Sequence, residues 1–161
     1  MAIVVGVDTY VSVEDADAYF LTRIGSEKWV ASDEATKEAA LVTATNIFNT
    51  MAWGGEQVDP LQLFAFPRKS AFIVVEGMPQ PFLNAVCEEA LHLIKNPEVL
   101  EDSGGVESLD VGSISLTKIR SPELVPSYIY EMISPYTRGG SYFSGVLPGS
   151  PFGGSLWWRA W

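Results

Sequence analysis

Cys87, Glu88, Glu89 and His92 have the types and spacing that could support chemistry, because they fall in one short stretch. Cys87 is the only cysteine and His92 the only histidine. This excludes an internal disulfide and any metal site built from several thiolates or imidazoles. Apolar neighbours predict a buried, inert thiol at Cys87 and a hydrogen-bonded core or interface role for His92. Glu88 and Glu89 precede His92 by one helical turn, and we expect them on a solvated helix face.

Other catalytic signatures are missing from the sequence. No glycine-rich loop has the phosphate-binding or dinucleotide-binding pattern, and no Gly-x-Ser-x-Gly sequence occurs. Ser144, Ser150 and Ser155 lie near glycines, but their segment is too flexible to hold a strained nucleophile. We therefore expect a protein that is not an enzyme, with no catalytic residue, no cofactor and no metal.

The sequence FAFPRK (64–69) places basic side chains directly after aromatic ones. Such a combination can stack on the bases of single-stranded DNA and contact its phosphates. The alternative is that Phe64 and Phe66 fill the core while Arg68 and Lys69 lie on a solvated loop. The net charge of −10, from 20 acidic and 10 basic side chains, argues against general DNA binding. It suits a wall past which DNA slides without sticking.

The C-terminal residues 139–161 combine six glycines, four serines and two prolines with six aromatic side chains. Glycine and proline at this density disfavour regular structure, so the segment cannot bury its aromatics in a core of its own. An exposed aromatic cluster indicates a docking segment, favoured here to bind another chain rather than fold back onto its own body. The predicted partner-binding residues are Tyr142, Phe143, Phe152, Leu156, Trp157, Trp158, Arg159 and Trp161.

Length and composition predict one globular domain followed by this arm. A chain of 161 residues with 47% hydrophobic and 19% charged residues is long enough for one hydrophobic core. The predicted boundary separates a helical domain, residues 1–138, from an extended arm, residues 139–161. We expect no signal peptide and no membrane contact, because no apolar run reaches the length of a membrane span.

Capping residues and hydrophobic periodicity predict the first helices. Ser12 caps a helix over residues 13–24, a short helical turn over 26–30 is anchored by Trp29, and residues 34–53 form the most regular helix. The apolar face of the first helix is predicted to comprise Ala16, Tyr19, Phe20, Leu21 and Ile24. The predicted stripe of the helix over 34–53 comprises Ala40, Val42 or Thr43, Ile47, Phe48 and Met51.

The second half of the chain adds two helices and a β element. Pro79 begins a helix that reaches residue 95, and residues 122–136 form the last helix. Residues 56–78 are expected to form an irregular connection with a β-prone stretch, and residues 106–119 to form a β-hairpin. The predicted fold class is mainly α: a small helical bundle with an inserted β-hairpin and an extended C-terminal arm.

Five motifs together resemble the small head–tail connector proteins of tailed phages. They are YVSVEDADAYF (10–20), KEAALVTAT (37–45), FAFPR (64–68), PQPFLNAVCEEAL (79–91) and VGSISL (111–116). Their order and spacing resemble the family over residues 8–136. Phe66 stands where the family usually has tryptophan, and the aromatic arm is not a general family feature.

The resemblance implies a helical bundle that assembles with copies of itself, as a dodecameric ring, beneath the portal protein of a virion. Such a ring prolongs the DNA channel without binding DNA specifically, and it presents a docking surface to a tail or nozzle protein. The resemblance therefore places the protein at the head–tail junction of the virion, after assembly in the host cytoplasm. The arm would strap onto the portal or onto a neighbouring subunit.

Two other functions stay open from the sequence. Some relatives have the label of a DnaT-like single-stranded DNA-binding protein, which makes a replication accessory protein the main alternative. The negative net charge argues against that alternative. Another oligomeric scaffold, such as a tail-completion factor, is the third candidate.

Overall fold

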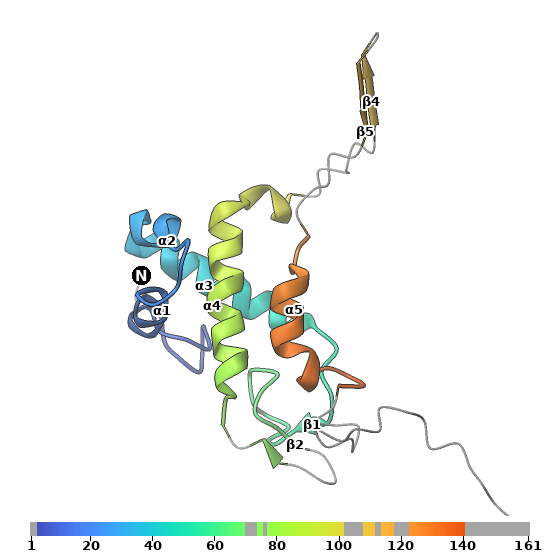
Figure 1. Cartoon of the computed structure of the whole chain (residues 1–161). Helices are drawn as coiled ribbons and strands as arrows, with labels where there is room; N and C mark the ends of the chain where they lie inside the picture. Colours follow the sequence, from blue (N-terminus) through green and yellow to red (C-terminus); the bar gives the residue numbers. More distant parts are fainter. Residues whose placement is uncertain are drawn as a thin grey trace, which may run out of the picture.

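Five helices make up the body in the computed structural model, which describes residues 3–69, 74–75, 77–101, 108–111, 114–117 and 123–140. They are α1 (Val13–Phe20), α2 (Glu27–Ala31), α3 (Glu34–Thr50), α4 (Gln80–Lys95) and α5 (Ser127–Ile133). Short 3-10 turns follow α4 and α5, at η1 (Pro97–Leu100) and η2 (Ser134–Tyr136). Helix α4 is central, with α3 crossing it and α5 alongside, while α1 and α2 lie on its other side (Figure 1).

The predicted class, mainly α with an inserted β-hairpin, is confirmed over this part of the chain. The hairpin pairs β4 (Ser108–Val111) with β5 (Ile114–Thr117), and its register sets Leu109 opposite Leu116. Figure 1 shows this hairpin beyond the end of α4, apart from the helices. The predicted C-terminal arm from residue 141 onward lies outside the described residues.

The start of α1 has the predicted cap and α4 begins after the predicted proline, whereas the Asp33 cap of α3 was not predicted. The amide of Asp15 donates to Ser12 Oγ at 3.0 Å, which satisfies one of the free N–H groups in the first turn of α1. The carboxylate of Asp33 accepts in the same way from the amide of Thr36 at 3.0 Å and begins α3. Pro79 precedes α4, where its missing N–H costs nothing.

Helix α1 is shorter than predicted, and its predicted apolar face is partly wrong. The helix ends at Phe20, and Leu21 and Ile24 are 84% and 95% exposed. The hydroxyl of Ser26 donates to the carbonyl of Phe20 at 3.1 Å, within a turn that points Arg23 toward α4. A tertiary ion pair therefore decides the path of the chain, and the two aliphatic side chains beside Arg23 are left in solvent.

Two further predictions need correction. The predicted Ala40 and Phe48 are buried, but Val42 and Thr43 are only half-buried, and the rest of the buried face of α3 is formed by Glu38, Leu41, Ala44 and Thr45. The last helix starts at Ser127, after Pro126, and not at Pro122. In both cases the helix exists as predicted, but packing against α4 selects its face and its length.

The connection over residues 56–78 is not wholly irregular. It contains three two-residue strands, β1 (Glu56–Gln57), β2 (Arg68–Lys69) and β3 (Val74–Val75), which pair antiparallel in that order. This small sheet holds the FAFPRK segment against the end of α3. Two-residue strands leave no alternating pattern in a sequence, so periodicity could not reveal them.

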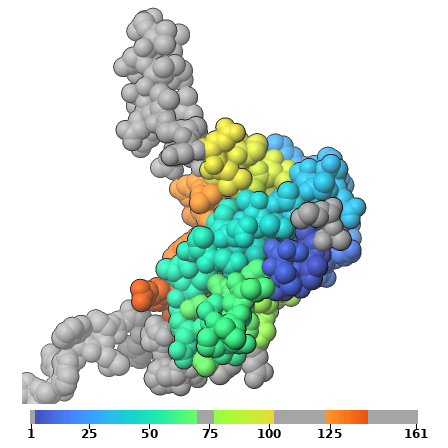
Figure 2. All heavy atoms as spheres, turned by 180° about the vertical axis from the view of Figure 1, so that it is seen from behind, coloured from blue at the N-terminus to red at the C-terminus, as the bar shows by residue number. Residues whose placement is uncertain are grey.

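An aromatic cluster around Phe82 fills the core where α3, α4 and the small sheet meet. The ring of Phe82 lies 4.5 to 5.7 Å from four other rings, in tilted or edge-on contacts. These four are Tyr10, Phe48, Trp53 and Phe66. From behind, the N-terminal segment is seen lying against α3 (Figure 2), where the amide of Tyr10 donates to Thr45 Oγ1 at 3.3 Å.

Candidate functional site

Glu88 and Glu89 are both buried, at 4% and 0% exposure, so the prediction of a solvated face is wrong. Helix α4 is contacted by α1, α2, α3 and α5. These partners cover the turn that holds both carboxylates. Burying two adjacent acidic side chains is costly unless each is paired or neutral, and the two residues differ in this respect.

Glu88 is the centre of a polar network that joins three segments. Arg23 donates to its carboxylate twice, from Nε to Oε1 and from Nη2 to Oε2, each at 2.7 Å. The hydroxyl of Tyr19 donates to Oε1 at 2.8 Å, and that of Tyr128 donates to Oε2 at 3.3 Å. Burial, followed by the charge of Glu88, raises the pKa of Tyr128 to about 12. The network locks α1, α4 and α5 together.

Glu89 has no such partner. Neither of its carboxylate oxygens forms a hydrogen bond. Burial raises the pKa of Glu89 to about 8, so the side chain is mostly protonated at neutral pH. The interior therefore tolerates Glu89 in its neutral form, and ionisation of this carboxyl would destabilise the folded protein.

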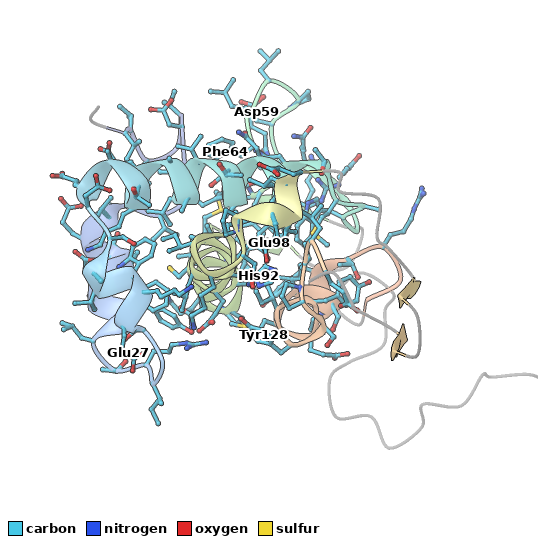
Figure 3. All side chains as sticks on the ribbon, turned by 90° about the horizontal axis from the view of Figure 1, so that it is seen from above. Glu27, Asp59, Phe64, His92, Glu98 and Tyr128 are labelled. Carbon is cyan, nitrogen blue, oxygen red and sulfur yellow. The ribbon has the colours of Figure 1, made fainter. Side chains whose placement is uncertain are left out.

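The predictions for His92 and Cys87 are confirmed. The amide of Asn96 donates to Nδ1 of His92 at 3.1 Å, and Nε2 donates to the carbonyl of Glu123 at 2.8 Å. His92 thereby joins the end of α4 to the segment that leads into α5, on which Tyr128 is labelled (Figure 3). Cys87 is buried, and burial raises the pKa of its thiol to about 12, which makes the thiolate inaccessible at neutral pH.

The FAFPRK segment is built into the core. Phe64 and Phe66 are 7% and 1% exposed, and Figure 3 shows Phe64 beneath the loop that holds Asp59. The guanidinium of Arg68 donates to the backbone carbonyls of Gly54 and Gly55 at 2.5 and 2.8 Å. The prediction that these phenylalanines fill the core is therefore confirmed, because buried rings cannot stack on bases. Its second part, that Arg68 and Lys69 lie on a solvated loop, is wrong, since both form β2 and are half-buried.

A groove of about 380 Å³ lies between α1 and the first half of α4. Its walls are formed by apolar parts of Val11, Tyr19 and Leu83, and its polar edge is formed by Asp15, Gln80 and Asn84. A second cavity, of about 510 Å³, lies where α1 and α3 begin and has several carboxylates on its walls. Among the described residues, no group of three or more His, Cys, Asp or Glu side chains is arranged to hold a metal ion.

The end of the described chain is fixed to the end of α3. Thr137 forms an antiparallel bridge with Trp53, and the amide of Arg138 donates to the carbonyl of Ala52 at 3.0 Å. Gly139 has a φ of +91°, and a Cβ at Gly140 would clash with backbone carbonyls of η2. Two glycines thus set the point from which residues 141–161 depart.

The predicted partner-binding residues all lie outside the described residues. They are Tyr142, Phe143, Phe152, Leu156, Trp157, Trp158, Arg159 and Trp161. The Glu88 network, by contrast, lies within the described residues, but it was not predicted from the sequence. The one available signal was the spacing of Tyr19 and Arg23, which are four residues apart and could have met one partner from a shared helix face.

Comparison with known proteins gives one match. Residues 2–147 match the family described as "Putative DnaT-like ssDNA binding protein". No curated protein and no solved structure matches the chain. The family match ends before Pro148, so the three tryptophans of the arm lie beyond it. Over the described residues, no helix is long and apolar enough to cross a membrane.

Proposed function

The chain belongs to this DnaT-like family, since the match spans residues 2–147, and we propose that it acts as a structural, non-enzymatic subunit at the head–tail junction of a virion. In this role copies assemble as a dodecameric ring in the host cytoplasm, between the portal protein and a tail or nozzle protein. DNA passes through the channel without specific binding, and the aromatic arm straps onto the portal or onto a neighbouring subunit.

The state of the FAFPRK segment is the observation on which this proposal rests. It is the place where the sequence most favoured a base-stacking site, and its phenylalanines are buried. The guanidinium of Arg68 is held by backbone carbonyls, including that of Ala65 at 3.0 Å. A segment that stabilises the core in this way is poorly suited to contact single-stranded DNA, and a scaffold is the function that this leaves best supported.

Electrostatics supports a wall for DNA rather than a binding groove. The net charge is −10, and several basic side chains among the described residues are engaged internally. Lys37 pairs with Asp17 at 2.8 Å, and Lys95 donates to the carbonyl of Gly25 at 2.8 Å. Phosphate binding requires clustered, available cations. An acidic surface instead repels DNA and lets it slide.

The arm supports a role in assembly. Ring subunits use two different surfaces, one on each side, so that each copy contacts the next head to tail. A glycine-rich segment that ends in WWRAW (157–161) supplies aromatic anchors of the kind that dominate protein interfaces. Because these residues lie beyond the family match, they are suited to a partner particular to this protein.

The test is the mass of the purified full-length protein in solution, with and without portal protein, measured by analytical ultracentrifugation. We expect a ring-sized complex with portal, and its loss when Trp157, Trp158 and Trp161 are all replaced by alanine. Far-UV circular dichroism of this triple variant checks that the body is still folded. Failure of the wild-type protein to bind portal or to self-assemble would overturn the proposal.

Binding of single-stranded DNA is the second candidate, and the family description favours it. It is tested with a fluorescent oligothymidylate at about 50 and 200 mM salt, since a phosphate binder loses affinity steeply over this range. Lys69→Glu removes the basic side chain that follows Arg68 in the FAFPRK segment, and Lys28→Glu makes the same change on α2 as a control. We expect no binding; binding that falls with salt and is lost in Lys69→Glu alone would establish the second candidate.

A further inference from the structure

We infer that the groove between α1 and α4 is the receptor for residues 156–161 of a second copy of this chain. The inference rests on the proposed ring assembly and deepens it, because it names the surface on which the arm docks. The occupant is an aromatic segment with one cation, LWWRAW. The groove has the size, the walls and the charge that such a segment requires.

The groove is large enough for aromatic side chains. Its volume of about 380 Å³ falls in the range of roughly 300–1,000 Å³ that is typical of ligand pockets. Val11, Tyr19 and Leu83 supply apolar walls, and the Tyr19 ring is held in place by its bond to Glu88. Fixed apolar walls favour insertion of an indole, because little side-chain freedom is lost on binding.

The charge at the edge of the groove complements the arm. Asp15 is exposed and keeps its orientation through the hydroxyl of Ser12, which donates to Oδ2 at 2.9 Å. Arg159 lies between Trp158 and Trp161 in the sequence, so a tryptophan in the groove brings a guanidinium close to its edge. An arginine–carboxylate pair at the rim fixes the register of an aromatic anchor.

The other described cavities fit this occupant less well. The cavity where α1 and α3 begin has Ile3, Val13 and Ala35 on its walls, but most of its lining is polar, because Glu14, Asp33, Glu34 and Glu38 also lie there. The shallow cavity beside η2 has Arg138 on its wall, which would repel Arg159. The groove beside α1 is therefore more apolar than the cavity where α1 and α3 begin, and it has a carboxylate at its edge, which the cavity beside η2 does not.

The arm is long enough to reach another subunit. Residues 141–161 follow Gly140, and a fully extended chain of this length spans roughly 70 Å at about 3.3 Å per residue. Docking of each arm in the groove of the next copy gives every subunit one donor surface and one acceptor surface. This head-to-tail contact is the type that closes into a ring.

The first test is binding of a fluorescent peptide, residues 141–161, to the full-length protein whose own Trp157, Trp158 and Trp161 are alanine. This variant leaves the groove without its normal ligand. Ala18 lines the groove and is exposed, so Ala18→Trp added to the variant fills the groove with little risk to folding. Ala39→Trp is the matched control, because Ala39 is exposed on α3 and lines none of the described cavities.

We expect the peptide to bind, and Ala18→Trp to weaken binding at least about tenfold, as loss of an interface anchor does. Ala39→Trp leaves the affinity unchanged. Replacing Asp15 by arginine weakens binding of the normal peptide and restores it for a peptide with Arg159→Asp. Absence of binding, or equal binding to the Ala18→Trp and Ala39→Trp proteins, overturns the inference.

A mixing experiment separates a second copy from the chain's own arm. The Ala18→Trp protein has an arm but no groove, and the triple-alanine protein has a groove but no arm. Each is expected to fail to self-associate alone, and the mixture to form a one-to-one complex in analytical ultracentrifugation. Peptide binding without this complex would show that the arm docks on its own body, which overturns the second-copy assignment. If Ala18→Trp still forms the portal complex that the triple-alanine protein does not, the proposed function stands and only this inference fails.

Discussion

Two consecutive residues of α4 solve the burial of a carboxylate in opposite ways. Glu88 faces Arg23, Tyr19 and Tyr128 and is satisfied by all three. Glu89 is rotated about a quarter-turn further around the helix, into a region where neither of its oxygens finds a donor. One side of α4 therefore stabilises a charge, and the other side suppresses one.

The difference shows that burial alone does not determine the state of an acidic side chain. A buried carboxylate keeps its charge when a guanidinium and hydroxyls replace the water it has lost. Without them it becomes neutral, which burial enforces at Glu89 by raising its pKa to about 8. The contribution of Glu88 to stability should thus depend on its contacts, and the contribution of Glu89 should depend on pH.

The largest expected effect is loss of the Glu88 network. Glu88→Leu leaves Arg23 without its partner while the Arg23 side chain is only 26% exposed. We expect the free energy of unfolding to fall by about 3–5 kcal/mol, as for other broken buried ion pairs, measured by urea denaturation. Glu98→Leu, on the exposed η1 turn (Figure 3), is the control and should change little. A loss below about 1 kcal/mol for Glu88→Leu would contradict the network's role.

The next effect is a pH dependence of the free energy of unfolding that is caused by Glu89. Its folded pKa of about 8 exceeds its ordinary value of 4.5, so the folded state holds this proton more tightly than the unfolded state does. Its contribution to stability is complete below about pH 4.5 and falls as pH rises, by about 3 kcal/mol at pH 7 and by about 5 kcal/mol at most above pH 8. Tyr128, which lies nearby on α5, has a pKa of about 12 and stays neutral throughout.

Glu89→Gln isolates this contribution. Urea denaturation at several pH values between about 5 and 8 should show wild-type stability falling relative to that of the variant. Parallel profiles for the two proteins would mean that Glu89 has an ordinary pKa. Glu89→Leu removes the buried polar group altogether and is expected to be as stable as the wild type or more so at the high end of the range.

A smaller effect is expected at Tyr19. Tyr19→Phe removes the 2.8 Å hydrogen bond to Glu88 and keeps the ring. Because the acceptor is charged and buried, we expect a loss of about 1–2 kcal/mol. Thermal denaturation at neutral pH is the measurement. A double-mutant cycle tests whether the two donors are coupled: it compares the stability lost in the double variant with the sum of the losses from Tyr19→Phe and Arg23→Met.

The smallest effect is expected at Tyr128. Its hydroxyl lies 3.3 Å from Glu88, and the side chain is about half exposed, at 49%. Water can replace this donor, so Tyr128→Phe should cost about 0.5 kcal/mol or less. A cost equal to that of Tyr19→Phe would show that the network is tighter on the α5 side than the distances indicate.

Local features of the fold were predictable from the sequence. Ser12 caps α1 and Pro79 begins α4 as predicted, because capping depends on residues within one turn. Trp29 is a buried anchor as predicted. The hairpin at β4 and β5 follows from its alternating pattern.

The states of Glu88, Glu89 and Ile24 were not predictable in this way. Arg23 is 65 positions from Glu88 in the sequence, and no periodicity indicates which helices will cover α4. The apolar stripe of α1 continues to Ile24 in the sequence although the helix ends earlier, because the ion pair redirects the chain. For the arm, the docking residues remain predictions from composition, since they lie outside the described residues.

The bridge between Trp53 and Thr137 also affects how the body resists a pulling force. Tension applied to the arm would enter the body at Gly140, and two backbone hydrogen bonds connect this segment to the residues after α3, from Arg138 to Ala52 and from Gly54 to Tyr136. These bonds transfer the load to the end of α3, the long helix that crosses α4, before α5 is pulled from its neighbours. A strap anchored in this way can bear a pulling force while the short helix beside it stays docked.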